Sequence, residues 1–153
     1  MIKREDDGIW IELRETIACH HDEVFHCLTT DHGLKRWYPV AADVDLRPGG
    51  QIVFGWNADM SSTTTVAILD FDPAGRIVWD WQAAHQDTHA PVYWQVQPRV
   101  EEGSRVVMRQ GPFKEDVESL LWMAEEIESW RWYLCNLRAV LESKHDMRKL
   151  RPL

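Results

Sequence analysis

Hydrophobic and polar residues alternate along the first two thirds of the chain with the period of two that is typical of β-strands. Residues 9–18 show this pattern first, because Ile9, Ile11, Leu13 and Ile17 share one parity. The same parity places Glu15 on the apolar face of the predicted strand. Further strands are predicted at residues 44–46, 51–56, 63–71, 76–82, 92–100 and 104–110. Short turn segments such as Pro48-Gly49-Gly50 separate them, which favours antiparallel hairpins.

Three helices complete the predicted elements. Two short helices are expected at residues 22–29 and 31–37, with Asp31 as the N-cap of the second. A long helix is expected at about 115–144, with acidic residues in its first turn. Its apolar residues recur at three- and four-residue spacing and predict one long buried stripe: Val117, Leu120, Leu121, Ala124, Ile127, Trp130, Leu134, Leu137 and Leu141.

The order of these elements predicts an α+β fold. We expect a curved antiparallel sheet of six to seven strands wrapped around the C-terminal helix, with two short helices after the first strand. The whole chain, residues 1–153, is expected to form one domain, with a core at about 9–144 and a basic tail at 145–153. In such a fold the space between sheet and helix can hold a ligand.

The charge and composition limit the classes of partner that we expect. The net charge of −8 argues against nucleic acid and anionic membranes, because both attract basic surfaces. No run approaches 18 apolar residues, and the first residues lack the pattern of a secretory signal. Three scattered cysteines indicate reduced thiols. We therefore expect a cytoplasmic protein.

Tryptophan is unusually frequent, with nine residues in 153. Trp79 and Trp81 share a strand face, Trp94 lies in a neighbouring predicted strand, and Trp130 belongs to the long helix. These four rings either line a cavity for an aromatic or lipid-like molecule or pack into a solid core. Trp37 is expected near the mouth of that space, where it either gates a ligand or anchors the two short helices on the sheet.

Several stretches along the chain together resemble one known family. They are, in chain order, residues 17–25, the 28–31 run with Leu34 and Trp37, the Pro48-Gly49-Gly50 turn, 70–73 followed by 76–81, and Ser129-Trp130 with Leu134 and Leu137. Their order resembles the START-like, or helix-grip, superfamily, and most closely its branch named after the activator of the heat-shock-protein-90 ATPase. The resemblance implies the helix-grip fold.

Three positions depart from the pattern of that branch. Cys19 or His20 stands where the family has proline, Gln110 stands where it often has histidine, and Ser129 replaces a common glycine. The changes at Gln110 and Ser129 bear on the polarity of the pocket and on the approach of helix to sheet, so they weaken any transfer of ligand specificity.

Glu15 is the most unusual polar residue of the predicted core. An inward carboxylate is costly unless it is paired, so Glu15 either orients a ligand or acts as an acid/base, or an arginine neutralises it, or the strand is irregular there. Metal binding is not expected. His85 and His89 lie in a predicted loop, and a strand or helix-cap geometry would point His20 and His21 apart. No nucleotide or nucleophile-elbow motif is present, so no cofactor is expected.

The leading functional hypothesis is a module that binds a small hydrophobic or aromatic molecule between sheet and helix. The predicted ligand-binding residues are Glu15, Trp37, Trp56, Trp79, Trp81, Trp94, Gln110, Trp130 and Leu134. One alternative is an enzyme of the cyclase, hydratase or hydrolase kind that uses Glu15 as acid/base near Gln110. Another is a co-chaperone-like interaction module, which rests on analogy of fold alone. Trp122 and Trp132 lie off the main stripe and, if exposed, would mark a contact surface, so we expect a homodimer.

Overall fold

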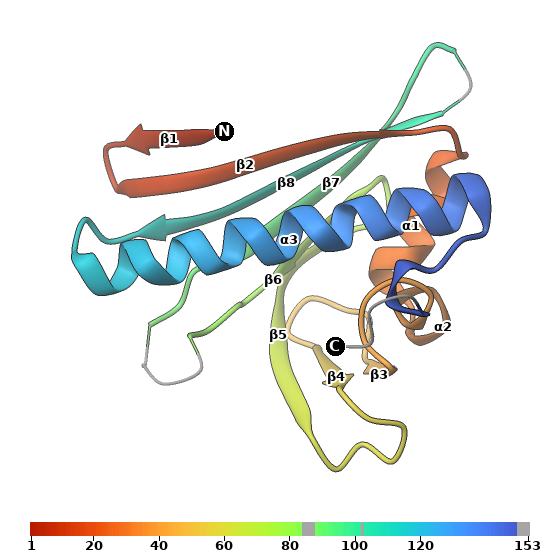
Figure 1. Cartoon of the computed structure of the whole chain (residues 1–153), viewed down its shortest axis with the longest axis horizontal. Helices are drawn as coiled ribbons and strands as arrows, with labels where there is room; N and C mark the ends of the chain where they lie inside the picture. Colours follow the sequence, from red (N-terminus) through yellow and green to blue (C-terminus); the bar gives the residue numbers. More distant parts are fainter. Residues whose placement is uncertain (84–87, 102, 150–153) are drawn as a thin grey trace.

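An eight-stranded antiparallel sheet wraps around one long helix in the computed structural model, which describes residues 1–83, 88–101 and 103–149 (Figure 1). The strand order is β1-β2-β8-β7-β6-β5-β4-β3. The strands are β1 (Ile2–Glu5), β2 (Gly8–Ile17), β3 (Ala41–Val44), β4 (Gln51–Gly55), β5 (Thr63–Asp72), β6 (Arg76–Trp79), β7 (Val92–Pro98) and β8 (Ser104–Phe113). The helices are α1 (His21–Thr29), α2 (Asp31–Lys35), α3 (Val117–Ser143) and the 3-10 helix η1 (Met147–Lys149).

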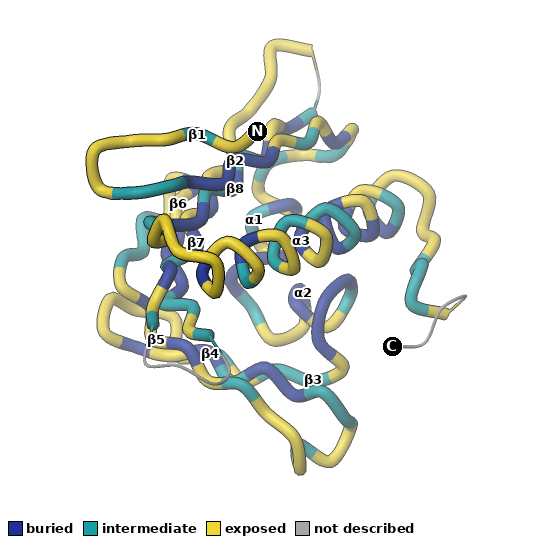
Figure 2. Tube along the Cα trace, turned by 60° about the vertical axis from the view of Figure 1, so that its left-hand side comes forward, coloured by how far each residue is buried: buried dark blue, intermediate teal, exposed yellow. Residues whose placement is uncertain are grey.

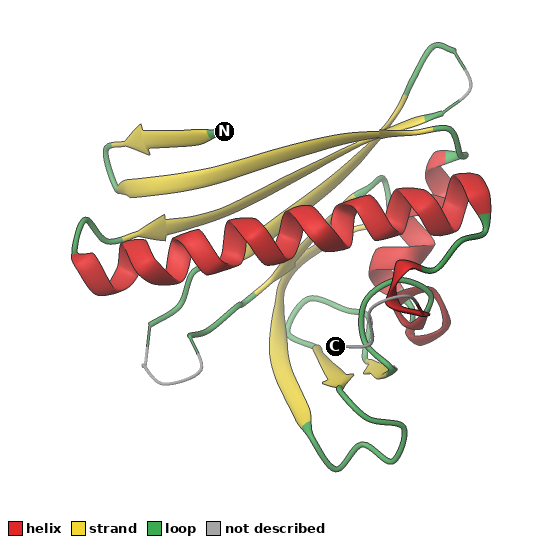
Figure 3. Ribbon diagram, in the orientation of Figure 1, coloured by secondary structure: helices red, strands yellow, loops and turns green. Residues whose placement is uncertain are grey.

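The predicted α+β helix-grip architecture is confirmed. Helix α3 crosses one face of the sheet, and α1 and α2 lie beside its C-terminal half (Figure 3). Alternating residues of β7 are buried, as the period of two predicts, and in β2 Ile11, Leu13 and Ile17 are buried. No helix among the described residues is long and apolar enough to cross a membrane. Cys19, Cys27 and Cys135 are free cysteines.

Several predicted boundaries were wrong. Strand β1 was not predicted, because its four residues IKRE carry only one apolar side chain, and it forms through a hairpin with β2 that pairs Glu5 with Gly8. Strand β3 ends at Val44, where a strand was predicted to begin, and β6 ends at Trp79 rather than residue 82. Helix α2 is capped by Thr30, whose hydroxyl accepts from the Gly33 backbone N–H at 2.9 Å, and not by Asp31.

The N-terminal turns of α3 differ most from the prediction. Val117, Leu120 and Leu121 are 75%, 36% and 63% exposed, and Ala124 is exposed as well. Figure 2 shows this end of the helix mostly in the colour of exposed residues. The buried positions are Ser119, Met123, Trp130, Tyr133, Leu134, Asn136, Leu137 and Val140. Packing of the C-terminal half therefore sets the rotation of the whole helix, and the first apolar residues of the predicted stripe face outward.

Candidate functional site

The interior tryptophans pack against one another. Trp79, Trp94 and Trp130 are at most 2% exposed, and their ring centroids are 5.2 Å (79–94), 5.6 Å (94–130) and 6.2 Å (79–130) apart. Trp81 is half-buried, and its ring lies edge-on to Trp130 at 5.3 Å. Leu134 is fully buried one helical turn further along α3. At this level of the structure the rings fill the space between sheet and helix, which is the solid-core alternative of the sequence analysis.

Trp37 anchors the short helices. Its indole N–H donates to the Cys27 carbonyl of α1 at 2.7 Å, and its buried ring lies edge-on to Trp94 at 6.0 Å. The indole N–H groups of Trp79 and Trp94 are also buried, but neither has an acceptor within the described part of the chain. Two unpaired donors at adjacent rings cost free energy, so this part of the core is held by ring packing and not by polar contacts.

The carboxyl group of Glu126, a half-buried residue of α3, lies beside Gln110. Oε2 of Glu126 accepts from Gln110 Nε2 at 2.9 Å and from Trp130 Nε1 at 3.0 Å, and Oε1 accepts from Trp122 Nε1 at 3.2 Å. The side chain of Trp81 also hydrogen-bonds this carboxyl group. Burial raises the pKa of Glu126 above its ordinary value, although these donors act in the opposite direction. Glu126 was not among the predicted site residues, because its acidic neighbours Glu125 and Glu128 indicate a solvent-exposed helix face.

The enzyme alternative places Glu15 near Gln110, but in the structure the two residues do not lie beside each other. Glu15 pairs with Val106 in the sheet and Gln110 pairs with Ile11, so the two are separated by four residues of β8, about 13 Å. The Glu15 carboxylate is 13% exposed and forms ion pairs with Arg131 at 3.2 Å and Arg138 at 3.1 Å. Neutralisation by arginine, one of the open alternatives, therefore describes this residue, which joins β2 to α3.

A pocket of about 580 Å³ opens beyond the C-terminal half of α3. Its lining comes from α2, the segment after it, the residue after β4, α3 and the C-terminal segment 146–149: Lys35, Tyr38, Val40, Trp56, Tyr133, Asp146, Arg148 and Lys149. Tyr38 joins this pocket to the core, because its ring centroid lies 4.5 Å from that of Tyr133 and 5.3 Å from that of Trp130. Burial raises the pKa of Tyr38 well above its ordinary value, so its hydroxyl is a neutral donor at physiological pH.

Trp56 forms one wall of the pocket. Its ring stacks on Phe54 with an interplanar angle of 17°, and its Nε1 donates to Thr64 Oγ1 at 2.9 Å. These contacts fix the orientation of the half-buried ring, so that the pocket has a rigid aromatic surface. Trp56 was among the predicted ligand-binding residues, whereas Tyr38 and Tyr133 were not.

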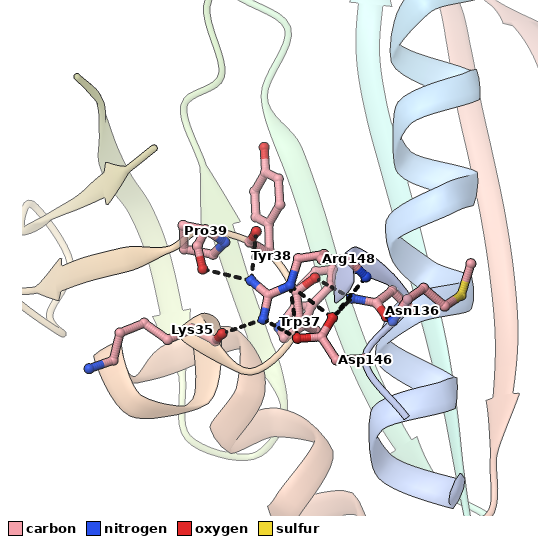
Figure 4. A network of polar contacts seen from close by, with 8 residues as sticks. Lys35, Trp37, Tyr38, Pro39, Asn136, Asp146 and Arg148 are labelled. Carbon is pink, nitrogen blue, oxygen red and sulfur yellow. Dashed lines mark hydrogen bonds and ion pairs between the residues drawn. The ribbon is translucent and has the colours of Figure 1, made fainter. Parts of the chain in front are cut away.

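Arg148 ties the C-terminal segment to the segment after α2 (Figure 4). Its guanidinium donates to the carbonyl oxygens of Lys35 at 2.7 Å and Pro39 at 2.9 Å, and it pairs with Asp146 at 2.8 Å. Asn136 of α3 adds a hydrogen bond to the Trp37 carbonyl at 2.8 Å. The Tyr38 ring points away from this network, while its carbonyl accepts from Arg148 at 3.2 Å. The network closes one end of the pocket with backbone contacts.

The two histidine pairs that were considered as metal ligands differ in their surroundings. His20 and His21 are not pointed apart by the helix cap: their ring centroids lie 4.2 Å apart, and one ligand atom from each lies within 4.8 Å of the other and of one from Asp22. However, Nδ1 of His20 already accepts from the Asp22 backbone N–H at 3.2 Å as the N-cap of α1. His89 contacts Asp80 at 3.0 Å, and His85 lies outside the described residues.

Comparison with solved structures identifies the same fold in other proteins. The Aha1 dimer from Colwellia psychrerythraea is 21% identical, with a TM-score of 0.73 over 88% of this chain and 96% of that one. A protein of Staphylococcus saprophyticus is 16% identical, with a TM-score of 0.75 over 91% and 96%. CalU16 from Micromonospora echinospora is 19% identical, with a TM-score of 0.72 over 98% and 86%.

The similarity to these structures shows the fold, whereas the family assignment rests on the sequence. No curated protein matches the chain. The model of the Activator of Hsp90 ATPase homolog 1-like protein family matches residues 18–142, which include both short helices, β3 to β8 and nearly all of α3. Because this match covers most of the 153 residues, the chain belongs to the Activator of Hsp90 ATPase homolog 1-like protein family, as its sequence motifs predicted.

Proposed function

We propose that this protein binds a small amphipathic or aromatic molecule in the pocket lined by Tyr38, Trp56 and Tyr133. The supporting observation is a pocket of about 580 Å³ with three aromatic side chains, a size and lining typical of small-molecule sites. The interior tryptophans stand behind this pocket as a rigid wall, since Tyr38 packs on Trp130 and also contacts Trp81 at 6.4 Å. The ligand therefore stacks on a preformed aromatic surface and does not require the core to open.

A pocket-blocking variant tests this proposal. Val40 lines the pocket and is 53% exposed, so Val40→Trp places a bulky ring in the pocket without disturbing the core. Val100→Trp is the matched control, because Val100 is fully exposed and lies outside the pocket lining. We expect at least one compound of a panel of fatty acids, phenols and polycyclic aromatics to bind the wild type and the control, but not Val40→Trp.

Binding is measured by titration calorimetry and by native mass spectrometry, and circular dichroism checks that each variant is folded. If no compound of the panel gives heat or an adduct with the wild type, the proposal fails. Equal affinity of the wild type and Val40→Trp would place the ligand at another site and refute this pocket.

We also propose that two copies of the chain associate through the outward apolar residues Val117, Leu120 and Leu121 at the start of α3. The support is that one similar structure is described as a dimer and that these side chains are exposed, which is costly for an unpaired surface. Trp122 and Trp132 would mark a contact surface if they were exposed, but both are half-buried, Trp122 against Phe113 and Trp132 against Tyr133.

Light scattering after size-exclusion chromatography tests the dimer. We expect a dimer for the wild type and for Leu69→Glu, whose residue is 51% exposed on β5, and a monomer for Leu121→Glu. A monomer mass for the wild type at every concentration would refute the association, and a dimer of Leu121→Glu would refute this interface.

A further inference from the structure

The pocket is positively charged in an acidic protein. The chain has 17 basic and 25 acidic residues, which gives a net charge of −8. The lining of the pocket reverses this balance, since it holds three cations, Lys35, Arg148 and Lys149, and one acid, Asp146. A smaller adjoining pocket shares Lys35, Asp146 and Arg148 and adds two more cations, Arg36 and Lys144. A patch whose sign opposes that of the whole protein concentrates ligands of the opposite charge.

Two of these pocket charges cancel each other. Arg148 pairs with Asp146 through Nε and Nη2, at 3.0 and 2.8 Å, and directs its remaining donors to backbone carbonyls. Arg148 therefore has no free donor for a ligand, and Asp146 offers no free negative charge. The geometry leaves Lys35 and Lys149 as the net charge of the pocket.

Both lysine side chains are available. Lys35 and Lys149 are exposed, and among the described residues neither ammonium group has an ion-pair or hydrogen-bond partner; only the backbone carbonyl of Lys35 is engaged, by Arg148. Lys3, by contrast, is half-buried, and its ammonium group pairs with Glu12 at 2.9 Å. Two unpaired lysines in the lining of an aromatic pocket match a ligand that has an anionic group on an apolar body.

On the basis of the proposed function, we infer that the ligand class is an aromatic carboxylate. Its ring lies against Tyr38, Trp56 and Tyr133, and its carboxylate lies between the ammonium groups of Lys35 and Lys149. The lysines select the charge of the ligand, while the aromatic side chains supply the contact area. Because both lysines are exposed, each contributes a modest, salt-dependent part of the affinity, about two- to fivefold.

Two probes of equal shape and different charge test this inference. The probes are 1-naphthoate and its neutral amide, 1-naphthamide, titrated by calorimetry at low and at high salt. We expect the wild type to bind the carboxylate about tenfold more tightly than the amide at low salt, with a smaller preference at high salt. In K35Q/K149Q we expect the preference to disappear while the affinity for the amide is unchanged. K114Q, a change at an exposed lysine before α3, is the control and should keep the preference.

The outcomes separate the two proposals. If the amide binds the wild type as tightly as the carboxylate, or K35Q/K149Q keeps the preference, the inferred ligand class is wrong while the pocket proposal stands. If neither probe binds and the compound panel also gives no binding, the proposed function fails and the inferred ligand class fails with it. A preference that K114Q loses as well would show a general charge effect and would overturn the role of the two lysines.

Discussion

Replacing Glu126 by glutamine keeps the size of the side chain but removes its charge and one of its two acceptor oxygens. Two donors, Gln110 Nε2 at 2.9 Å and Trp130 Nε1 at 3.0 Å, converge on Oε2, while Trp122 Nε1 donates to Oε1 at 3.2 Å. The amide oxygen is best placed where two donors converge, so the new NH₂ group faces the indole N–H of Trp122. The lost hydrogen bond at the half-buried indole N–H of Trp122 lowers the free energy of unfolding by about 1 kcal/mol.

The size of this loss depends on pH. Burial raises the pKa of Glu126 above its ordinary value of 4.5, so folding favours the neutral carboxyl group. Its contribution to stability is fully present below the pKa of the unfolded chain and is lost as the pH rises through the folded pKa. A pKa difference of one between the two states corresponds to about 1.4 kcal/mol. The deficit of Glu126→Gln relative to the wild type is therefore largest at pH 4.5 and decreases towards pH 8.

Urea unfolding followed by far-ultraviolet circular dichroism at pH 4.5, 6 and 8 measures this deficit. The control is Glu125→Gln, an exposed neighbour on the same helix, for which we expect a change within about 0.5 kcal/mol at each pH. A deficit of Glu126→Gln that is constant, or that increases with pH, would contradict a raised pKa of Glu126 in the folded protein. It would mean that the four donors outweigh burial and that the folded protein favours the ionised carboxylate.

Three other predictions concern the contacts of the sheet, the helix and the C-terminal segment. Arg148→Met removes the hydrogen bonds to three backbone carbonyls, so proteinase K should cleave segment 144–149 several-fold faster than in the wild type; an unchanged rate would show that the guanidinium does not hold this segment. Glu15→Gln should lower the free energy of unfolding by about 1 kcal/mol at low salt, because the partner arginines are half-exposed, and a loss of equal size in 1 M salt would contradict this electrostatic origin. Cys135 is exposed, whereas burial raises the pKa of Cys27 to about 11, so a thiol reagent at pH 8 should label Cys135 long before Cys27 in the folded protein, and equal rates would count against the burial of Cys27.

Local sequence patterns predicted most of the secondary structure. Strands β2, β5, β7 and β8 and helix α1 lie within a few residues of their predicted ranges, because alternation and helix caps are local properties. Strand β1 was missed because an edge strand with one apolar residue has no such pattern. Edge strands gain their stability from pairing with a neighbour, and that neighbour is visible only in the fold.

The rotation of α3 could not be predicted from apolar spacing alone. The predicted stripe begins at Val117 and Leu121, whereas the face towards the sheet runs through the buried Ser119 and Met123 and the half-buried Glu126 before it reaches Trp130. These positions follow a regular spacing of four and three residues, which was a signal available in the sequence. It was hidden because a serine and a glutamate occupy core-facing positions. The acid beside Gln110 is the half-buried Glu126 for this reason, and Glu15 forms ion pairs with two arginines instead.

Local periodicity and ordered motifs along the chain were enough to predict the fold class, the order of the elements and the family, because they record which side of each element is buried. The filling of the core by the interior tryptophans, and the pocket that opens beside them, depend on the three-dimensional packing and were not predictable from the chain. That pocket joins Tyr38, Trp56 and Tyr133 with two lysines from α2 and η1, residues that are far apart along the chain. Local patterns carry no information on such distances, since these are set by how the helix packs on the sheet and by the contacts of Arg148.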